Sequence, residues 1–345
     1  MSSSMQSPTS ESDISNLDLL RALAVLIVYL SHLLMVFRVN NLLGFISLYQ
    51  LSQAGVMIFF VHTAFVLMLS LERQNRGGLD MFRIFYVRRA FRIYPLSCLA
   101  IVVVLTASIP SFPTEAFHAP SRLTVLANLM LAQNLIKSPP ILNVLWSLPY
   151  EVQMYLALPF VFVLVRRRGS WASFLLWSLS VVMLLVVRIK GMGLLIYVPC
   201  FLGGVVGYRL WRSTRLQLPS FLWLLTILIA IAMRLTLPLK FAPWCASLVL
   251  GMAIPQFRQF RTSLIRRPSL FVAKYSYGIY LSHCAIFWLL LPRHPILMIL
   301  LSTLIPMMLY HVVEDPMVRL GKWLTANRSR PRQKHVQSAA GSVPA

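Results

Sequence analysis

The sequence predicts an all-α membrane protein, a bundle of about ten transmembrane helices with both chain ends in the cytoplasm. Of its 345 residues, 58% are hydrophobic and 12% are charged, and the mean hydropathy is +0.73. This balance lies outside the range of soluble domains. Apolar runs of about 17 to 25 residues, the length that crosses a hydrocarbon core, recur almost from end to end. Because each run must satisfy its own backbone polar groups in lipid, helices are expected.

Ten apolar runs define the predicted spans. Together they form one membrane domain, which is flanked by two polar terminal segments. The spans are 17–37, 51–71, 93–109, 144–165, 171–188, 194–210, 219–235, 240–256, 270–290 and 295–313. Residues 1–16 are polar and lack the basic start of a cleavable signal peptide, so we expect a disordered cytoplasmic N-terminus. The membrane domain covers 17–320, and 321–345 is expected to be a basic, disordered cytoplasmic tail. The amphipathic stretch 122–137 is too short and polar for a span and predicts an interfacial or re-entrant helix.

The net charge is +23, and the basic residues that produce it are distributed as the predicted membrane topology requires. Lys and Arg gather in short clusters between the apolar runs, and with a cytoplasmic N-terminus 24 of the 32 fall on the cytoplasmic side. This placement argues against nucleic-acid binding, which favours one continuous basic surface. The four cysteines are scattered without CxxC or other ligand-like spacing, so the sequence predicts neither a disulfide framework nor a metal site.

The first span, "LDLLRALAVLIVYLSH", carries three ionisable residues. A charge at mid-bilayer costs about 2.5 to 3.5 kcal/mol, so such residues are functional candidates. Asp18 and Arg21 lie three residues apart at the cytoplasmic end, where an ion pair is expected. Arg21 and His32 are eleven residues apart, about three turns, so they share one helix face with a rise of roughly 16 Å. The alternative to a functional role is that His32 is a structural histidine, hydrogen-bonded to a neighbouring helix.

The fourth span, "LWSLPYEVQMYLALP", contains a single acid, Glu151. Ser147, Glu151 and Tyr155 are spaced four residues apart and therefore share a face. Pro149 is expected to loosen the helix just before the acid. Counted from the cytoplasmic ends of their spans, Glu151 and His32 lie at a similar depth, roughly 22 Å, so we expect them to be partners.

Two further clusters complete the candidate site. Arg88, Arg89 and Arg92 gather where the third span begins, and their guanidinium groups suit a phosphorylated cytoplasmic ligand. Among the other histidines, His283 is singled out because Tyr280 lies one turn before it in "SYGIYLSH".

These motifs resemble, in order along 17–320, those of the membrane acyltransferase 3 family, bacterial O-acyltransferases that modify sugars. The matching positions are Leu17, Asp18, Arg21, Ala24 and His32; Gly55, Phe59, Phe60 and Phe65; Arg88, Arg89, Arg92, Ile93 and Pro95; Trp146, Ser147, Leu148, Glu151, Gln153, Tyr155 and Pro159; and Tyr280, His283, Glu314 and Pro316. The chain departs from the family pattern at Thr63 and Ala64, usually Ser-Gly, at Pro149 and Tyr150, and at Ser282, commonly Trp.

The resemblance implies a multi-pass enzyme of the bacterial inner membrane that uses acyl-CoA, commonly acetyl-CoA, as donor. The acceptor would be a hydroxyl of a carbohydrate or glycolipid, and self-association is left open. Arg21, Arg88, Arg89 and Arg92 would hold the donor's phosphates. A neutral His32 would take the acceptor's proton, with Glu151 fixing its tautomer. The supporting residues would be Asp18, Trp146, Ser147, Tyr155, Tyr280 and His283.

Two alternatives stay open at the level of sequence. Within the same function, an acyl-enzyme could form on Ser147, Tyr155 or Cys284, although direct transfer is preferred. In a different class, a multi-pass exporter could place His32 and Glu151 in a proton path. The halves of the chain show no internal repeat of the kind common in transporters, and a non-catalytic scaffold would leave the buried His and Glu unexplained.

Overall fold

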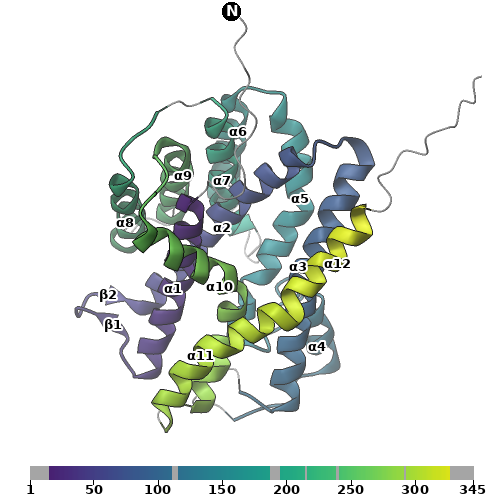
Figure 1. The fold of residues 1–345 in the computed structure, drawn as a ribbon, viewed down its shortest axis with the longest axis vertical. Coiled ribbons are helices and arrows are strands. Elements are labelled where there is room, and N and C mark those ends of the chain that lie inside the picture. Colours follow the sequence, from purple (N-terminus) through teal and green to yellow (C-terminus); the bar gives the residue numbers. More distant parts are fainter. Residues whose placement is uncertain are drawn as a thin grey trace, which may run out of the picture.

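A computed structural model describes residues 15–110, 116–186, 195–213, 216–237, 241–290 and 293–326. These residues form a helical bundle with one small hairpin, β1 (Asn41–Leu42) and β2 (Ile46–Ser47) (Figure 1). The first helices are α1 (Ser15–Val36), α2 (Leu48–Arg73), α3 (Gly78–Thr106), α4 (Arg122–Leu129), α5 (Leu148–Arg166) and α6 (Ser170–Val186). The later ones are α7 (Val198–Trp211), α8 (Phe221–Thr236), α9 (Ala242–Ala253), α10 (Ser263–Leu290), α11 (Pro295–Leu309) and α12 (Asp315–Ala326).

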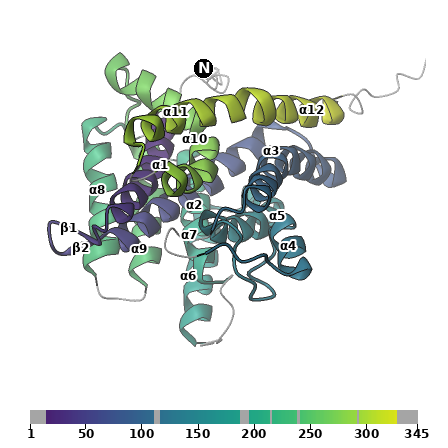
Figure 2. The same cartoon turned by 90° about the horizontal axis from the view of Figure 1, so that it is seen from below.

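Helices α1, α2 and α10 form the middle of the bundle (Figure 1). Helix α1 packs mainly against α2 and α10, whereas α5 packs against α2, α3 and α7. Helices α6 to α9 form one flank and α3 to α5 the other, while α11 and α12 run diagonally across the bundle as one long segment (Figure 1). Figure 2 shows the end of this segment, α12, alongside α3, with which it is in contact.

Two glycines hold α2 unusually close to its neighbours. A Cβ added at Gly55 would lie 2.8 Å from the carbonyl oxygen of Ala24 in α1, and one at Gly204 of α7 would lie 2.2 Å from that of Val61 in α2. Small residues at helix crossings allow such backbone approach within a membrane. They fix α2 between α1 and α7, and α2 contributes one wall of the site described below.

The predicted spans correspond to helices, which confirms the all-α class. By length and composition, five described segments could cross a membrane: Ser15–Val36, Leu48–Arg73, Gly78–Thr106, Asn143–Arg166 and Pro295–Ala326. Shorter apolar helices lie at Ser170–Val186, Leu195–Trp211 and Phe221–Thr236. The count of ten spans and the cytoplasmic placement of both ends therefore stay predictions.

Several predicted boundaries move. Helix α1 begins at Ser15, whose Oγ donates a 2.8 Å hydrogen bond to the carbonyl oxygen of Phe260, so ordered structure starts inside the predicted N-terminal tail. Helix α12 continues to Ala326, so the first residues of the predicted C-terminal tail are helical. Residues 1–14 and 327–345 lie outside the described part of the chain.

The segment before Glu151 also differs from the prediction. Residues Asn143–Trp146 form a 3-10 turn, and α5 begins only at Leu148. Pro149 therefore sits in the first turn of α5, where its missing N–H would lack a partner anyway, rather than loosening the middle of a helix. As a result, Glu151 lies at the start of α5.

Candidate functional site

A cavity with an open mouth lies between α1, α2, α3, α5 and α10. Its polar lining residues are Arg21, His62, Thr63, Arg89, Arg92, Ser147, Glu151, Tyr155, Ser276, Tyr277 and Tyr280. Seven of these were predicted from the sequence: Arg21, Arg89, Arg92, Ser147, Glu151, Tyr155 and Tyr280. Helices far apart along the chain thus bring most of the predicted polar residues to one cavity.

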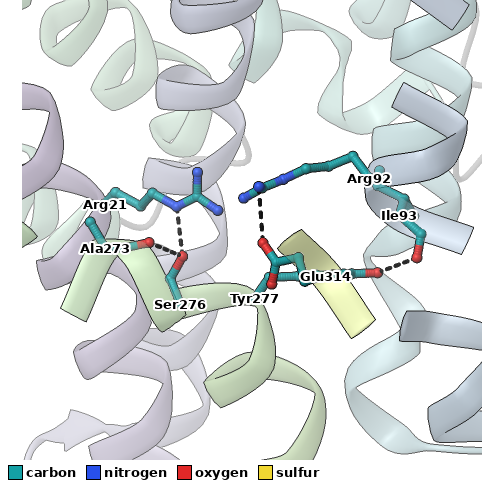
Figure 3. A network of polar contacts seen from close by, with 7 residues as sticks. All are labelled: Arg21, Arg92, Ile93, Ala273, Ser276, Tyr277 and Glu314. Atoms are coloured by element: carbon teal, nitrogen blue, oxygen red, sulfur yellow. Dashed lines mark hydrogen bonds and ion pairs between the residues drawn. The ribbon is translucent and has the colours of Figure 1, made fainter. Parts of the chain in front are cut away.

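Two arginines face each other across this cavity (Figure 3). The Arg21 Nε donates a 2.6 Å hydrogen bond to the Ser276 Oγ, which in turn donates to the Ala273 carbonyl oxygen at 2.8 Å. The Arg92 Nη1 lies 2.9 Å from the Glu314 Oε1, and the Glu314 side chain is fully buried. Like charges that point toward one another repel, and an anion between them removes that cost. The arrangement therefore suits a negatively charged ligand.

Glu314 was not among the predicted site residues, although it belongs to the matched C-terminal motif. It lies at the end of a π-helical turn, Tyr310–Glu314, between α11 and α12. Such turns are rare and occur often at functional sites. Its place in that motif was the signal that could have identified it, because Glu314 lies just beyond the last predicted span, 295–313.

Glu151 does not have the partner that its depth predicted. Its Oε1 accepts a short hydrogen bond from the Tyr155 hydroxyl one turn later in α5, and both side chains line the cavity. Within the described residues no hydrogen bond joins Glu151 to His32, so the predicted pair is not formed. The physical reason is that α1, which carries His32, packs mainly against α2 and α10, whereas Glu151 lies on α5. Residues at equal depth need not lie on neighbouring helices.

His32 is paired with another histidine instead. Its Nδ1 lies 2.8 Å from the Nε2 of His283, and the planes of the two rings are inclined by only 9°. The Nδ1 of His283 lies 2.9 Å from the carbonyl oxygen of Ile279, which can only accept. His283 therefore carries its proton on Nδ1 and accepts through Nε2, so His32 donates through Nδ1. No hydrogen bond from a described residue reaches the Nε2 of His32, so its lone pair is placed to act as a base.

The histidine pair lies beyond the end of the cavity. Neither His32 nor His283 lines it, but Tyr280 does, and the Tyr280 ring centroid is 6.2 Å from that of His283. Cys284 completes the group, with its Sγ 3.5 Å from the His32 Nδ1 and 3.4 Å from the His283 Nε2. Tyr280 thus borders both the charged cavity and the cluster of two imidazoles and a thiol.

Ser147 is held by hydrogen bonds that do not activate it. The Tyr280 hydroxyl donates to the Val144 carbonyl oxygen at 2.8 Å, so the 2.7 Å contact between Tyr280 and Ser147 uses the proton of Ser147. A serine that donates to a tyrosine has no base to remove its proton. Trp146, also predicted, packs its ring 5.8 Å from that of Tyr197 and is not among the cavity-lining residues.

Two predicted residues lie at the edge of the site. The Arg88 Nε donates to the Thr325 Oγ1 of α12 at 2.9 Å, and Arg88 lines a surface hollow with Arg73 and Arg76. An adjoining hollow is lined by Arg73, Arg88 and Arg89 and so leads toward the cavity. Asp18 forms no ion pair in the described part of the chain. The Nε of Arg21, its expected partner, donates to Ser276.

His62 is a second residue that the sequence reasoning did not select. It is 5% exposed, lies on α2 and lines the cavity, and its ring forms no hydrogen bond within the described residues. The criterion that selected His32, an ionisable residue within an apolar span, applies equally to His62. The sequence alone does not show that His62 shares a cavity with residues of α3 and α5.

Comparison with known proteins identifies a family by sequence. The sequence model of a family described as an acyltransferase domain, the acyltransferase 3 family, matches residues 14–311. No curated protein and no solved structure shows significant similarity to the chain. The family match spans most of the helices that contribute to the cavity and the histidine pair.

Proposed function

The chain belongs to the acyltransferase 3 family and is a membrane acyltransferase, and we propose that it moves an acetyl group from acetyl-CoA to a hydroxyl of a sugar or glycoconjugate. The observation that carries this proposal is the gathering of Arg21, Arg89 and Arg92, from two helices, around one cavity. Three guanidinium groups there face two carboxylates, those of Glu151 and Glu314. The excess positive charge suits the phosphates of coenzyme A.

The donor would enter from the basic surface beside α12. Arg73, Arg76 and Arg88 would hold the ribose phosphate, because they line the hollow outside the cavity. Arg89 lines both the cavity and the adjoining hollow, so it would contact the pyrophosphate. The pantetheine chain would then extend through the cavity toward Tyr280.

Proton removal would take place at the far end of α1. The Nε2 of His32 takes the proton of the acceptor hydroxyl as that oxygen attacks the thioester carbonyl. The C–S bond breaks, the acyl group becomes an ester, and the proton passes from His32 to the departing thiolate or to water. The resulting imidazolium keeps its Nδ1–H bond to the Nε2 of His283, which stabilises it. Tyr280 would have to move aside for donor and base to meet.

Glu151 is assigned to the donor side of this reaction rather than to His32. It shares the cavity with Arg21, Arg89 and Arg92 and is held by Tyr155. A carboxylate there limits the repulsion among the arginines while the cavity is empty. The fixing of the His32 tautomer, which the sequence ascribed to Glu151, falls to His283.

Transfer by the purified protein tests this function. Full-length protein in detergent is incubated with radiolabelled acetyl-CoA and a polysaccharide or glycolipid acceptor, and both ester formation and release of CoA are measured. The proposal requires stoichiometric release of CoA and labelled ester without an ion gradient. Export of a glycan by reconstituted protein, with no consumption of acetyl-CoA in detergent, would favour the exporter instead. Mass spectrometry of surface glycans with and without the gene would identify the acceptor.

A further inference from the structure

Three side chains with metal-binding atoms meet where α1 and α10 pack together: His32, His283 and Cys284. Their ligand atoms, the His32 Nδ1, the His283 Nε2 and the Cys284 Sγ, all lie within 4.8 Å of one another. We propose that they form a site for Zn²⁺ or a similar borderline-soft divalent ion, and that the bound ion shuts off acyl transfer. Imidazole and thiolate together are the donor set that zinc prefers.

The distances agree with tetrahedral coordination. With Zn–N near 2.0 Å and Zn–S near 2.3 Å, a nitrogen and a sulfur on one tetrahedron lie about 3.5 Å apart. The observed N···S distances are 3.5 Å for His32 and 3.4 Å for His283. The N···N distance of 2.8 Å, which is that of a hydrogen bond, must widen by about 0.5 Å to admit the ion. The two nearly parallel rings must also turn, so that both lone pairs point at the ion rather than along the line between the nitrogens.

The surroundings of His283 support the same conclusion. Histidines that bind metals through one nitrogen almost always donate the other N–H to a carboxylate, a carbonyl or water. The His283 Nδ1 already donates to the Ile279 carbonyl oxygen at 2.9 Å, which leaves Nε2 as the ligand atom. His283 and Cys284 are 1% and 2% exposed, so two of the three ligands are fixed by packing. Three protein ligands leave a fourth position for water.

Binding of the ion would remove the base. Cys284 would lose its thiol proton to solvent and bind as a thiolate. The proton on the His32 Nδ1 would move to Nε2, because Nδ1 becomes a ligand, so one proton is released in total. His32 would then have no free lone pair for the acceptor hydroxyl. Metal binding rests on the geometry alone, whereas inhibition rests on the proposed function.

Cobalt spectroscopy tests the site without any assay of activity. Purified full-length protein is stripped with a chelator and titrated with Co²⁺, whose bond to a thiolate gives an absorption band. We expect a band that saturates at one equivalent and is lost in both Cys284→Ala and Cys284→Ser. Cys200→Ala is the matched control, because Cys200 is also buried but lies on α7, and it should keep the band. A wild-type protein without the band, or a Cys284→Ala protein that keeps it, would overturn the site.

A zinc titration of the transfer rate tests the inhibition. Each protein is compared with its own rate in chelator, and wild type and Cys200→Ala should be inhibited at Zn²⁺ concentrations at least tenfold below those needed for Cys284→Ala. Equal sensitivity of all three proteins would overturn the inhibitory role even if the cobalt band appears. If no protein transfers acetyl groups even in chelator, the proposed function fails, whereas the cobalt titration still decides the metal site.

Discussion

The two ends of the polar face of α1 differ in their electrostatics although they pack against the same helix. Arg21 bonds Ser276, and His32 bonds His283, so both ends contact α10. Around Arg21 the residues are charged and open to a cavity. Around His32 the residues are neutral. There, the ring nitrogen that carries the proton on each histidine determines which nitrogen can accept a proton. In the proposed mechanism, one helix therefore binds the donor's phosphates at one end and supplies the base at the other.

The comparison also shows what each end needs in order to be stable. Charges in an enclosed space require opposite charges or a ligand, which explains the Arg92–Glu314 ion pair and the Glu151 carboxylate. A neutral imidazole pair requires only one donor and one acceptor in line. Changes at the Arg21 end should therefore affect donor binding, and changes at the His32 end should affect turnover.

The largest effect is expected for His32→Ala, which removes the proposed base. General-base catalysis contributes about 10² to 10⁴ in rate, so kcat should fall by about 10³-fold while the protein still inserts and the donor KM changes little. His62→Ala is the comparison, because His62 is the imidazole within the cavity itself. Steady-state rates in detergent measure both. A greater loss in His62→Ala than in His32→Ala would reassign the base.

A smaller loss is expected for His283→Ala, which leaves the His32 Nδ1–H without an acceptor. Hydrogen-bond partners that orient metal-bound histidines are typically worth about 10- to 100-fold in activity, and we expect a loss of that size here, in kcat rather than in the donor KM. His283→Gln should recover part of it, because its amide oxygen can accept the same proton. Equal losses in the two variants would mean that His283 serves packing alone.

Arg89→Ala should act on binding instead of turnover. Arg89 forms no hydrogen bond or ion pair with the described residues, so it is available to a ligand. A bond to a charged group is worth about 1.5 to 3 kcal/mol, so the KM for acetyl-CoA should rise by about tenfold or more. Arg89→Lys keeps the charge and should give an intermediate KM. The assignment fails if kcat falls and KM stays constant.

The smallest effect is expected for Ser147→Ala. Its hydroxyl donates one hydrogen bond to Tyr280, so the free energy of unfolding should fall by about 1 kcal/mol and kcat should change less than in the other variants. Thermal unfolding in detergent and rate measurements check the two parts. Complete loss of transfer, together with labelled acyl-enzyme in wild type, would instead support covalent catalysis on Ser147.

The sequence predicted most of the helices, because apolar runs and their limits are local properties. It also predicted that Arg21 and His32 share a face, and their common contact with α10 confirms this. Helical spacing determines the height and the face of each residue on its own helix. Predictions from spacing therefore succeed when all the residues concerned lie on one helix.

Relations between helices were less accessible. Counting residues gave a depth for Glu151 and His32, but which helices stand next to α1 depends on packing across the whole bundle. The contribution of Glu314 from a π-helical turn, and the approach of Cys284 to two histidines, also depend on three-dimensional packing. Residue spacing therefore missed a cluster whose members lie at positions 32, 283 and 284.

The central claim is that donor binding near Arg21 and proton removal at His32 are separate steps. It is tested most directly by the double variant Arg89→Ala/His283→Ala, which removes one cavity neighbour of Arg21, on α3, and the hydrogen-bond partner of His32, on α10. Effects of independent sites on kcat/KM add as free energies within about 0.5 kcal/mol. We therefore expect the double variant to combine the raised donor KM of one single variant with the lowered kcat of the other. A double variant no worse than the poorer single variant would show that the arginines and the histidine pair act as one unit and would contradict the account.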